Sequence, residues 1–300
     1  MTARLYTVAT APFEAARQVA ILPEGHRCRR WHGHSFLARA RAQLPPGWAP
    51  FHGAETDELA ERLAAAVAPL DSQRLNDRLP VPTDENIARW VRARLAVPGI
   101  ATVGIQSTRD QGADLDERDH AHIWRRFRFE AAHQLPNVPD GHPCGRMHGH
   151  GFEVILHADQ DLGNQDLGVD FDHLSELWAP LGAELHYACL NDLPGLANPT
   201  SEHLAAWLWR RLQPALPALT CITVYETASA GCHYDGTHYR IWKEQRFESA
   251  LRLPWAGAAD PRRRLHGHSY VIRLHLTAPL DEVMGWTVDY GDVKALFKPI

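Results

Sequence analysis

Residues 148–150 read His-Gly-His, and the same tripeptide recurs at residues 32–34 and 266–268. The three copies are 116 and 118 residues apart. A second motif, Phe-Glu-Ala-Ala, stands at residues 13–16 and again at 129–132, with the same spacing of 116 residues. Two motifs repeated in one order at one spacing indicate a chain built from tandem copies of one structural unit.

Two further motifs extend the match between the first two copies. Leu-Asn-Asp occupies residues 75–77 and 190–192, and a Pro-Thr-x-Glu segment occupies residues 82–85 and 199–202. Four landmarks therefore follow one another in the same order in both copies. Coincidence does not produce such agreement, so the two copies are expected to share one fold.

These landmarks divide the chain into two full units, near residues 1–120 and 121–240, and a partial third unit over residues 241–300. The third unit stops shortly after Asp289-Tyr290, which corresponds to Asp170-Phe171 in the second unit. The later motifs of the unit are missing from it. We expect either a natural chain that ends there or a shortened form of a longer protein, and the sequence leaves both open.

The composition describes a folded protein with a large core. Of 300 residues, 45% are hydrophobic, and the formal net charge of −5 provides no basic surface for a nucleic acid. Residues 1–19 lack both the apolar core of a signal peptide and the length of a membrane span. The five cysteines, an odd number, indicate free thiols rather than a disulfide framework. We therefore expect a cytoplasmic protein with neither a nucleic-acid nor a membrane partner.

The second unit has a readable order of elements. Its hydrophobic periodicity predicts strands at residues 124–135, 150–158 and 220–227, helices at residues 172–187 and between Thr200 and Pro214, and a strand at residues 238–247 that leads into the third unit. Each unit then reads strand, strand, helix, helix, strand, strand. This order predicts the α+β class, with two helices on one face of an antiparallel four-stranded sheet.

Three histidines of the second unit form a candidate zinc site. His148 and His150 lie two apart at the start of a predicted strand, so both imidazoles point to one face. His133 lies near the end of the preceding strand, which is expected to be its neighbour. Three imidazoles with an open fourth position are typical of catalytic zinc. Two histidines on a strand are by themselves more often ordinary surface residues, so the third histidine carries the prediction.

The other two units act as internal controls. The first unit keeps His32 and His34 but has Arg17 where the second unit has His133, and the third unit has Leu251 there. Arginine stays protonated and does not bind zinc, and leucine has no donor atom. The sequence therefore predicts one Zn²⁺ per chain, held by the second unit.

The second unit resembles 6-carboxytetrahydropterin synthase, the queuosine-pathway branch of the 6-pyruvoyltetrahydropterin synthase family. The resemblance implies tandem tunnelling-fold (T-fold) units that close into a barrel-like ring of twelve strands, with two rings stacked as a dimer and active sites between units. The first and third units resemble degraded copies of the same sequence. The matching stretches are residues 129–133, 144–150, 190–196, 198–202, 226–227 and 230–232.

The resemblance also implies a reaction. The expected substrate is 7,8-dihydroneopterin triphosphate, and the expected products are 6-carboxytetrahydropterin, acetaldehyde and triphosphate. A zinc ion would polarise a side-chain oxygen of the pterin and acidify nearby C–H bonds. Two alternatives stay open: 6-pyruvoyltetrahydropterin synthase activity, which eliminates triphosphate alone, and a pterin-binding assembly subunit that turns substrate over poorly.

Three residues are expected to act on the pterin beside the metal. Cys144, four residues before His148, would move the proton, with its pKa lowered by the neighbouring ion. Glu226 would accept two N–H groups of the pterin, and Thr227 belongs to the same matching stretch. An ordinary small buried cysteine and an exposed strand glutamate are the alternative interpretations. The first unit has Ser107 in place of Glu226, which argues against a complete site there.

One expected feature is incomplete. The family has an Asp-His pair just before Leu-Asn, but this chain has His186-Tyr187 there in the second unit and Asp71-Ser72 in the first. We therefore treat His186 and Asp71 as candidate catalytic residues that replace parts of the pair. A histidine titrates near neutrality, so His186 could serve as an acid or base. Two other interpretations stay open: the third unit of a longer natural chain could supply the pair, because the resemblance implies that it comes from a neighbouring unit, or His186 is an ordinary histidine at a helix end.

Overall fold

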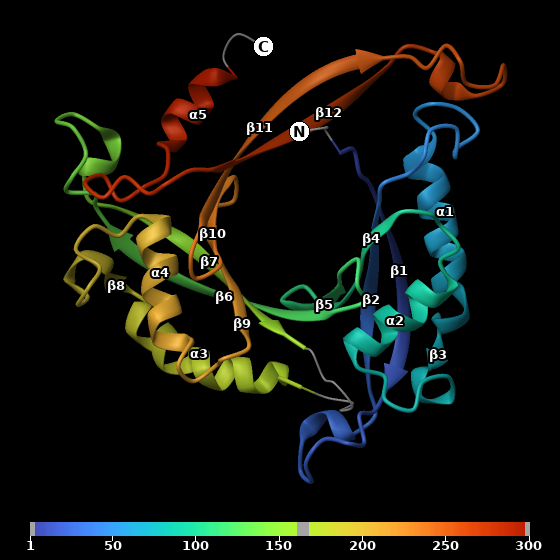
Figure 1. The fold of residues 1–300 in the computed structure, drawn as a ribbon, viewed down its shortest axis with the longest axis horizontal. Helices are drawn as coiled ribbons and strands as arrows, with labels where there is room; N and C mark the ends of the chain where they lie inside the picture. Colours follow the sequence, from blue (N-terminus) through green and yellow to red (C-terminus); the bar gives the residue numbers. More distant parts are fainter. Residues whose placement is uncertain (1–3, 161–167, 298–300) are drawn as a thin grey trace. The chain divides into compact units, whose positions relative to one another are not determined.

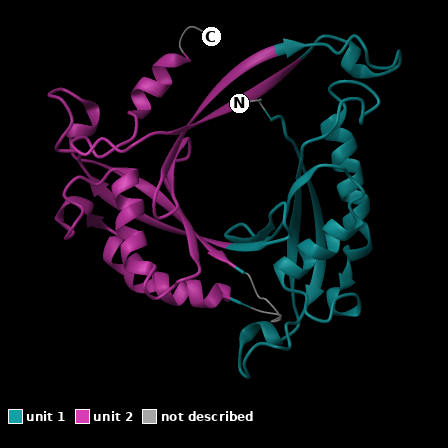
Figure 2. Cartoon of the chain, viewed as in Figure 1, with its two compact units in different colours: residues 1–123, 160–168, 250–266 teal, residues 124–159, 169–249, 267–300 magenta. Residues whose placement is uncertain are grey.

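The computed structural model describes residues 4–160 and 168–297, and these residues form two compact units (Figure 2). Unit 1 comprises residues 1–123, 160–168 and 250–266, and unit 2 comprises residues 124–159, 169–249 and 267–300. The third sequence repeat is thus divided between the two units. The outer ends of the first and third predicted repeats, residues 1–3 and 298–300, lie outside the described residues.

Unit 1 contains the first repeat as a sheet with the strand order β3-β1-β2-β4-β5. Helices α1 and α2 lie on one face of this sheet (Figure 1). Alternate residues of β1, among them Ala11 and Phe13, are buried against these helices. The bounds are β1 (Thr7–Arg17), β2 (His32–Ala42), α1 (Glu55–Val67), β3 (Gln73–Arg74), α2 (Asp84–Arg94), β4 (Ile100–Thr108) and β5 (Gln111–Leu115).

Unit 2 contains the second repeat and most of the third, with the strand order β6-β7-β9-β10-β11-β12. The short strand β8 pairs with β6, as β3 pairs with β1 in the first repeat. Helices α3 and α4 lie together on one face of β6, β7 and β9 (Figure 1). The bounds are β6 (Ala121–His133), β7 (His148–Asp159), α3 (Phe171–Leu185), β8 (Ala188–Cys189), α4 (Ser201–Leu212), β9 (Leu219–Thr227), β10 (Ala230–Tyr234), β11 (Tyr239–Leu251), β12 (His266–Thr277) and α5 (Tyr290–Leu296).

The predicted order of elements in the second repeat is confirmed. Strand, strand, helix, helix, strand, strand corresponds to β6, β7, α3, α4, β9 and β10, with β11 leading into the third repeat. The hydroxyl of Thr200 caps α4 by accepting a hydrogen bond from the amide of His203 at 3.1 Å, and the helix ends before Pro214. The tandem T-fold prediction holds for the repeats, whereas the closed ring concerns the arrangement of the two units and stays a prediction.

An aromatic pair marks the same place in each repeat. Phe13 stacks on Phe36 with ring centroids 4.9 Å apart, and Phe129 stacks on Phe152 at 5.0 Å. In the third repeat Phe247 stacks on Tyr270 at 5.0 Å. The first two pairs are buried under helices, but Phe247 is 38% exposed. The third repeat therefore keeps the packing of its hairpin while part of its apolar face reaches solvent.

No helix among the described residues is long and apolar enough to cross a membrane. The structure has all five cysteines as thiols rather than in disulfides.

The exposed apolar face of β12 leads to a prediction about assembly. Ile272 corresponds to the fully buried Val154 of the second repeat, yet it is 39% exposed, and β12 is the last strand in the sheet order of the described residues. An exposed edge and an apolar face both favour association with another chain. We expect Ile272→Glu to shift the purified chain toward the monomer in sedimentation velocity. Val271→Glu, on the opposite face of the strand, is the control, and an equal shift with it would contradict this assignment.

Candidate functional site

Three histidine side chains meet where β6 ends and β7 begins. His133 is the last residue of β6, and His148 and His150 are the first and third residues of β7. The ring of His133 lies 4.5 Å from that of His148 and 5.2 Å from that of His150, between centroids. One ligand nitrogen from each ring lies within 4.8 Å of the other two. The geometry predicted from residue spacing is therefore present.

Two backbone carbonyls orient these rings. His133 Nδ1 lies 3.0 Å from the carbonyl oxygen of Pro199, and His148 Nδ1 lies 2.7 Å from that of Arg146. A carbonyl only accepts, so each Nδ1 carries the proton and each Nε2 presents its lone pair. Partners of this kind fix the tautomer and orientation of histidines that bind metals.

The free nitrogens of this cluster fit a metal ion. His133 Nε2 and His150 Nε2 are buried and have no hydrogen-bond partner among the described residues. Leaving a buried polar atom without a partner costs about 1–3 kcal/mol, so two such atoms side by side need an explanation. A cation that binds the exposed lone pairs supplies one, and three imidazole nitrogens are a donor set that Zn²⁺ prefers.

The electrostatics of the cluster favour neutral imidazoles. Burial lowers the pKa of His133 and of His150, and the charge of Glu226 opposes that shift in both cases. Glu226 Oε1 lies 3.6 Å from His150 Nε2. Because only a neutral imidazole has a lone pair for a metal, burial prepares these side chains for binding.

Glu226 stands at the far end of β9, with a side chain that is 14% exposed. Its Oε2 accepts a hydrogen bond of 2.8 Å from the hydroxyl of Ser201, the first residue of α4. The start of a helix stabilises negative charge, so this position suits a carboxylate. The hydroxyl of Thr227, the next residue, accepts a bond of 3.4 Å from the amide of Ser229 in the turn to β10.

Cys144 lies in a short 3-10 helix between β6 and β7, and its thiol is partly buried. Its amide donates to His142 Nδ1 at 3.1 Å. Burial raises the pKa of the Cys144 thiol, and the charges of Glu226 and Asp289 raise it further. The sequence predicts that a bound metal ion lowers the pKa of Cys144. Burial and the two carboxylates of the protein act in the opposite direction and raise it.

The first repeat places a guanidinium where the second has the histidine cluster. Arg17 ends β1 as His133 ends β6, and its Nη1 donates to the carbonyl of Pro82 at 3.0 Å, as His133 Nδ1 does to Pro199. Its Nη2 lies 3.2 Å from His34 Nε2. A fixed positive charge therefore contacts the imidazole that corresponds to His150, which argues against a metal there.

The partner of Arg17 reveals an exchange of residues between the repeats. Asp84, the first residue of α2, is 2.6 Å from Arg17 and accepts a 2.6 Å bond from Ser107 on β4. In the second repeat the helix start carries the hydroxyl of Ser201 and the strand carries the carboxylate of Glu226. Carboxylate and hydroxyl have thus traded places. The first repeat keeps the same hydrogen bond but directs its carboxylate at an arginine.

The third repeat keeps only part of the cluster. His266 Nδ1 lies 2.7 Å from the carbonyl of Arg264, which repeats the orientation of His148. Leu251 ends β11 where His133 ends β6, and Arg262 stands in the position of Cys144. The third repeat therefore lacks both the third nitrogen donor and the thiol.

The candidates for the missing Asp-His pair lie elsewhere. His186 Nδ1 lies beside Glu130 on β6, 3.2 Å from its amide nitrogen and 3.0 Å from Oε2, and it can accept from the amide or donate to the carboxylate but not both at once. Asp71, in unit 1, accepts from the amide of Glu14 at 2.8 Å. The charged groups that act on Cys144 are Glu226 and Asp289 instead. The contacts of His186 are therefore with Glu130 on β6 and do not include Cys144. Asp71 has the same position in the first repeat, because it accepts from the amide of Glu14, which corresponds to Glu130.

The sequence reasoning missed a segment of the third repeat that lies against this site. Thr287 donates from its amide and its hydroxyl to Glu202 Oε1, at 2.8 and 3.1 Å. Burial raises the pKa of Glu202 to about 7. The sequence does mark this segment, because Asp289-Tyr290 matches Asp170-Phe171 of the second repeat. The match does not say which repeat the segment contacts.

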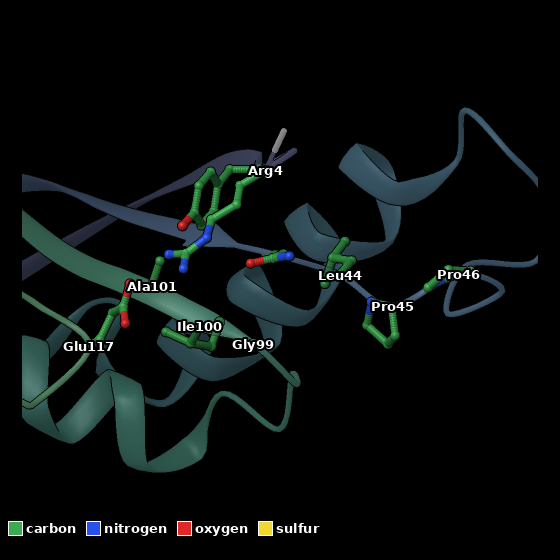
Figure 3. Close-up of a pocket in the computed structure, with 10 residues that line it drawn as sticks. Arg4, Leu44, Pro45, Pro46, Gly99, Ile100, Ala101 and Glu117 are labelled. Carbon is green, nitrogen blue, oxygen red and sulfur yellow. The ribbon is translucent and has the colours of Figure 1, made fainter. Parts of the chain in front are cut away.

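Unit 1 offers two other features outside this cluster. Asp116, His120 and His122 bring donor atoms within 4.8 Å of one another, but all three are partly exposed and Asp116 Oδ1 accepts from two backbone amides. Figure 3 shows a pocket lined by the charged Arg4 and Glu117 and by the apolar Leu44, Pro45, Pro46 and Ile100. That pocket contains none of the predicted site residues.

Comparison with known proteins gives consistent matches. The family model described as 6-pyruvoyl tetrahydropterin synthase matches residues 7–117, 122–237 and 240–300. A Synechocystis protein named 6-carboxy-5,6,7,8-tetrahydropterin synthase is 38% identical over 119 residues, covering 37% of this chain and 91% of that protein. A relative from Archaeoglobus fulgidus is 29% identical over 85 residues, covering 28% of this chain and 69% of that protein. The solved structure of Caenorhabditis elegans 6-pyruvoyl tetrahydropterin synthase is 20% identical, with a TM-score of 0.36, covering 39% of this chain and 95% of that one.

The metal prediction can be tested by stoichiometry. We expect metal analysis of the purified chain to give about one zinc, which His148→Ala removes because two ligands leave a weak site. His266→Ala is the matched control, because it deletes the equivalent side chain of the third repeat. Zinc that survives His148→Ala, or is lost with His266→Ala, would contradict the assignment.

The Arg17–Asp84 pair leads to a prediction about stability. The Asp84 side chain is fully buried and that of Arg17 is 6% exposed, so Arg17→Ala leaves a buried carboxylate without its partner. We expect a loss of about 3–5 kcal/mol in the free energy of unfolding, measured in urea. The double variant Arg17→Ala, Asp84→Ala should recover much of that loss, and a double variant as unstable as the single one would argue against the pairing.

Proposed function

Because the chain belongs to the 6-pyruvoyl tetrahydropterin synthase family and repeats it in three tandem segments, we propose that it is a zinc-dependent pterin lyase with one working site, in the second repeat. The observation that carries this proposal is the cluster of His133, His148 and His150, whose two orphaned nitrogens are buried beside Glu226. Arg17 and Leu251 remove that cluster from the other two repeats.

The proposed substrate is 7,8-dihydroneopterin triphosphate, converted to 6-carboxytetrahydropterin, acetaldehyde and triphosphate, as in queuosine biosynthesis. The similarity to a protein named 6-carboxy-5,6,7,8-tetrahydropterin synthase supports this choice. The stretches around Cys144 and from Pro194 to Glu202 support it too. We place the reaction in the cytoplasm and expect the chain to work as a homo-oligomer.

Each residue of the proposed site would have a role that follows from its side-chain chemistry. Glu226, held by Ser201, would accept N–H groups of the pterin ring and fix its orientation, with Thr227 beside it. Cys144 would take and return a proton on the pterin side chain, a role that requires the thiolate form. His133, His148 and His150 would hold Zn²⁺, which supplies Lewis-acid polarisation of a side-chain oxygen when bound.

Two other functions remain as alternatives with observations behind them. Triphosphate elimination without loss of the side chain, the 6-pyruvoyltetrahydropterin synthase reaction, would use the same metal and thiol. A pterin-binding assembly subunit with little turnover is favoured by the incomplete Asp-His pair, since the second repeat has His186-Tyr187 and the first has Asp71-Ser72 at that place.

Product analysis separates these functions. We expect the zinc-loaded chain to convert 7,8-dihydroneopterin triphosphate to a carboxylated pterin and acetaldehyde, identified by mass spectrometry and an aldehyde assay. Cys144→Ala should lower turnover by about 10²–10⁴-fold, as expected for loss of a general acid–base group. Cys28→Ala, the same loop position in the first repeat, should have no such effect. A pyruvoyl product would instead establish the first alternative, and binding without turnover the second.

A further inference from the structure

We propose that two residues of the third repeat are positioning residues for the site of the second: Asp289 positions the Cys144 loop through His142, and Tyr290 positions Glu226 through Ser201. This inference rests on the proposed function for the roles of Cys144 and Glu226, but the contacts themselves do not depend on it. Asp289 and Tyr290 are thus positioning residues, which act through groups that would touch the substrate.

The segment that carries these residues is anchored to the second repeat before it reaches the site. Asn137 donates to the carbonyl of Val283 at 2.6 Å, and Asn198 donates to that of Met284 at 2.7 Å. Thr200, the cap of α4, donates to the carbonyl of Gly285 at 2.5 Å. Side chains of the second repeat therefore hold three successive backbone carbonyls, so the segment has a defined position.

Gly285 shows how close this approach is. Its φ of +77° favours glycine, and a Cβ there would lie 2.5 Å from His203 and 2.6 Å from Asn198. Any other residue would push the segment away from the start of α4. The backbone at Gly285 thus lets the following residues, through Tyr290, lie against the second repeat.

The first part of the proposal concerns Asp289, which is linked through His142 to the loop that carries Cys144. His142 Nδ1 accepts from the Cys144 amide at 3.1 Å, so its Nε2 carries the proton and donates to Asp289 Oδ2 at 3.0 Å. Asp289 therefore fixes the tautomer that lets His142 hold the Cys144 backbone. Asp289 Oδ1 meanwhile caps α5 by accepting from the amide of Gly291 at 2.7 Å.

The charge of Asp289 gives this part of the proposal a measurable signature. The titratable groups around Cys144 are His142 in its own loop, Glu226 on β9 and Asp289 at the start of α5. Burial raises the pKa of the thiol first, and the two carboxylates add to that shift. Removing the charge of Asp289 should therefore lower the pKa of Cys144.

The second part of the proposal links Tyr290 to the carboxylate expected to bind the pterin. Ser201 Oγ uses its proton to donate to Glu226 Oε2 at 2.8 Å, so it accepts from the Tyr290 hydroxyl, 3.1 Å away. Tyr290 stands where the second repeat has Phe171, which has no hydroxyl. The third repeat thus adds a donor that fits a serine at the helix start and fixes the direction of its hydrogen bond.

The test uses the full chain with Asp289→Asn and Tyr290→Phe, and Asp292→Asn on the exposed side of α5 as the charge-matched control. Asparagine caps a helix as well as aspartate does, so Asp289→Asn keeps the helix cap and removes both the charge and the carboxylate oxygen that accepts from His142. Alkylation of Cys144 by iodoacetamide is followed against pH by peptide mass spectrometry, with Cys28 as internal reference. We expect Asp289→Asn to move the Cys144 midpoint down by about 0.5–1 pH unit and to leave that of Cys28 unchanged.

Binding of neopterin, followed by its fluorescence, tests the second part of the proposal. Tyr290→Phe should weaken binding by about 3–10-fold, the value of one hydrogen bond lost behind the carboxylate, while zinc content stays at the wild-type level. Variants that behave like Asp292→Asn in both assays would overturn the proposal. Failure of the proposed lyase function appears separately, as absence of product from the wild-type chain, and leaves the alkylation result interpretable.

Discussion

In each complete repeat a carboxylate lies between the start of the second helix and the strand that follows it, largely removed from solvent, and a positive partner stabilises a carboxylate in such a place. The carboxylate is Asp84 in the first repeat and Glu226 in the second, and each accepts a hydrogen bond from a serine that faces it. A hydrogen bond alone does not compensate for burying a negative charge. In the first repeat Arg17 supplies the missing charge at 2.6 Å. In the second repeat the corresponding place is occupied by the imidazoles of His133 and His150, whose Nε2 atoms have no hydrogen-bond partner among the described residues.

This constraint explains why a single residue decides the character of each repeat. The His-Gly-His tripeptide is present three times, and in each copy the first histidine bonds through Nδ1 to a backbone carbonyl two residues earlier, at 2.7–2.8 Å. Its glycine also has a local reason: a Cβ at Gly149 would lie 3.0 Å from the carbonyl of Ala131, and one at Gly33 would lie 3.3 Å from that of Ala15. The tripeptide thus fits the close pairing of two strands, whether or not a metal binds. The residue that ends the preceding strand determines whether a third ligand stands beside the two histidines.

Much of the fold and the histidine cluster followed from the sequence because their determinants are local. Strand alternation, a threonine cap and a proline stop are properties of a few neighbouring residues, and they located β6, β7 and α4 closely. The histidine cluster needed one further step, that consecutive strands lie side by side. The His142–Asp289 contact was beyond this reasoning, because it joins residues 147 apart through a segment whose docking depends on tertiary packing. The Asp84–Ser107 exchange was missed for the same reason, since a swapped pair looks like two unrelated substitutions in a sequence.

The third repeat differs from the second at some residues of the histidine and cysteine cluster and matches it at others. Residues that would serve its own site have been replaced: Leu251 stands for the third histidine and Arg262 for the thiol, and Arg262 instead forms an ion pair with Asp260 at 2.7 Å. Residues that face the second repeat have kept their chemistry, since Asp289 caps its helix as Asp170 does and contacts His142. Contacts with the second repeat therefore account for Asp289 and Tyr290, whereas His266 is held within its own repeat by the carbonyl of Arg264.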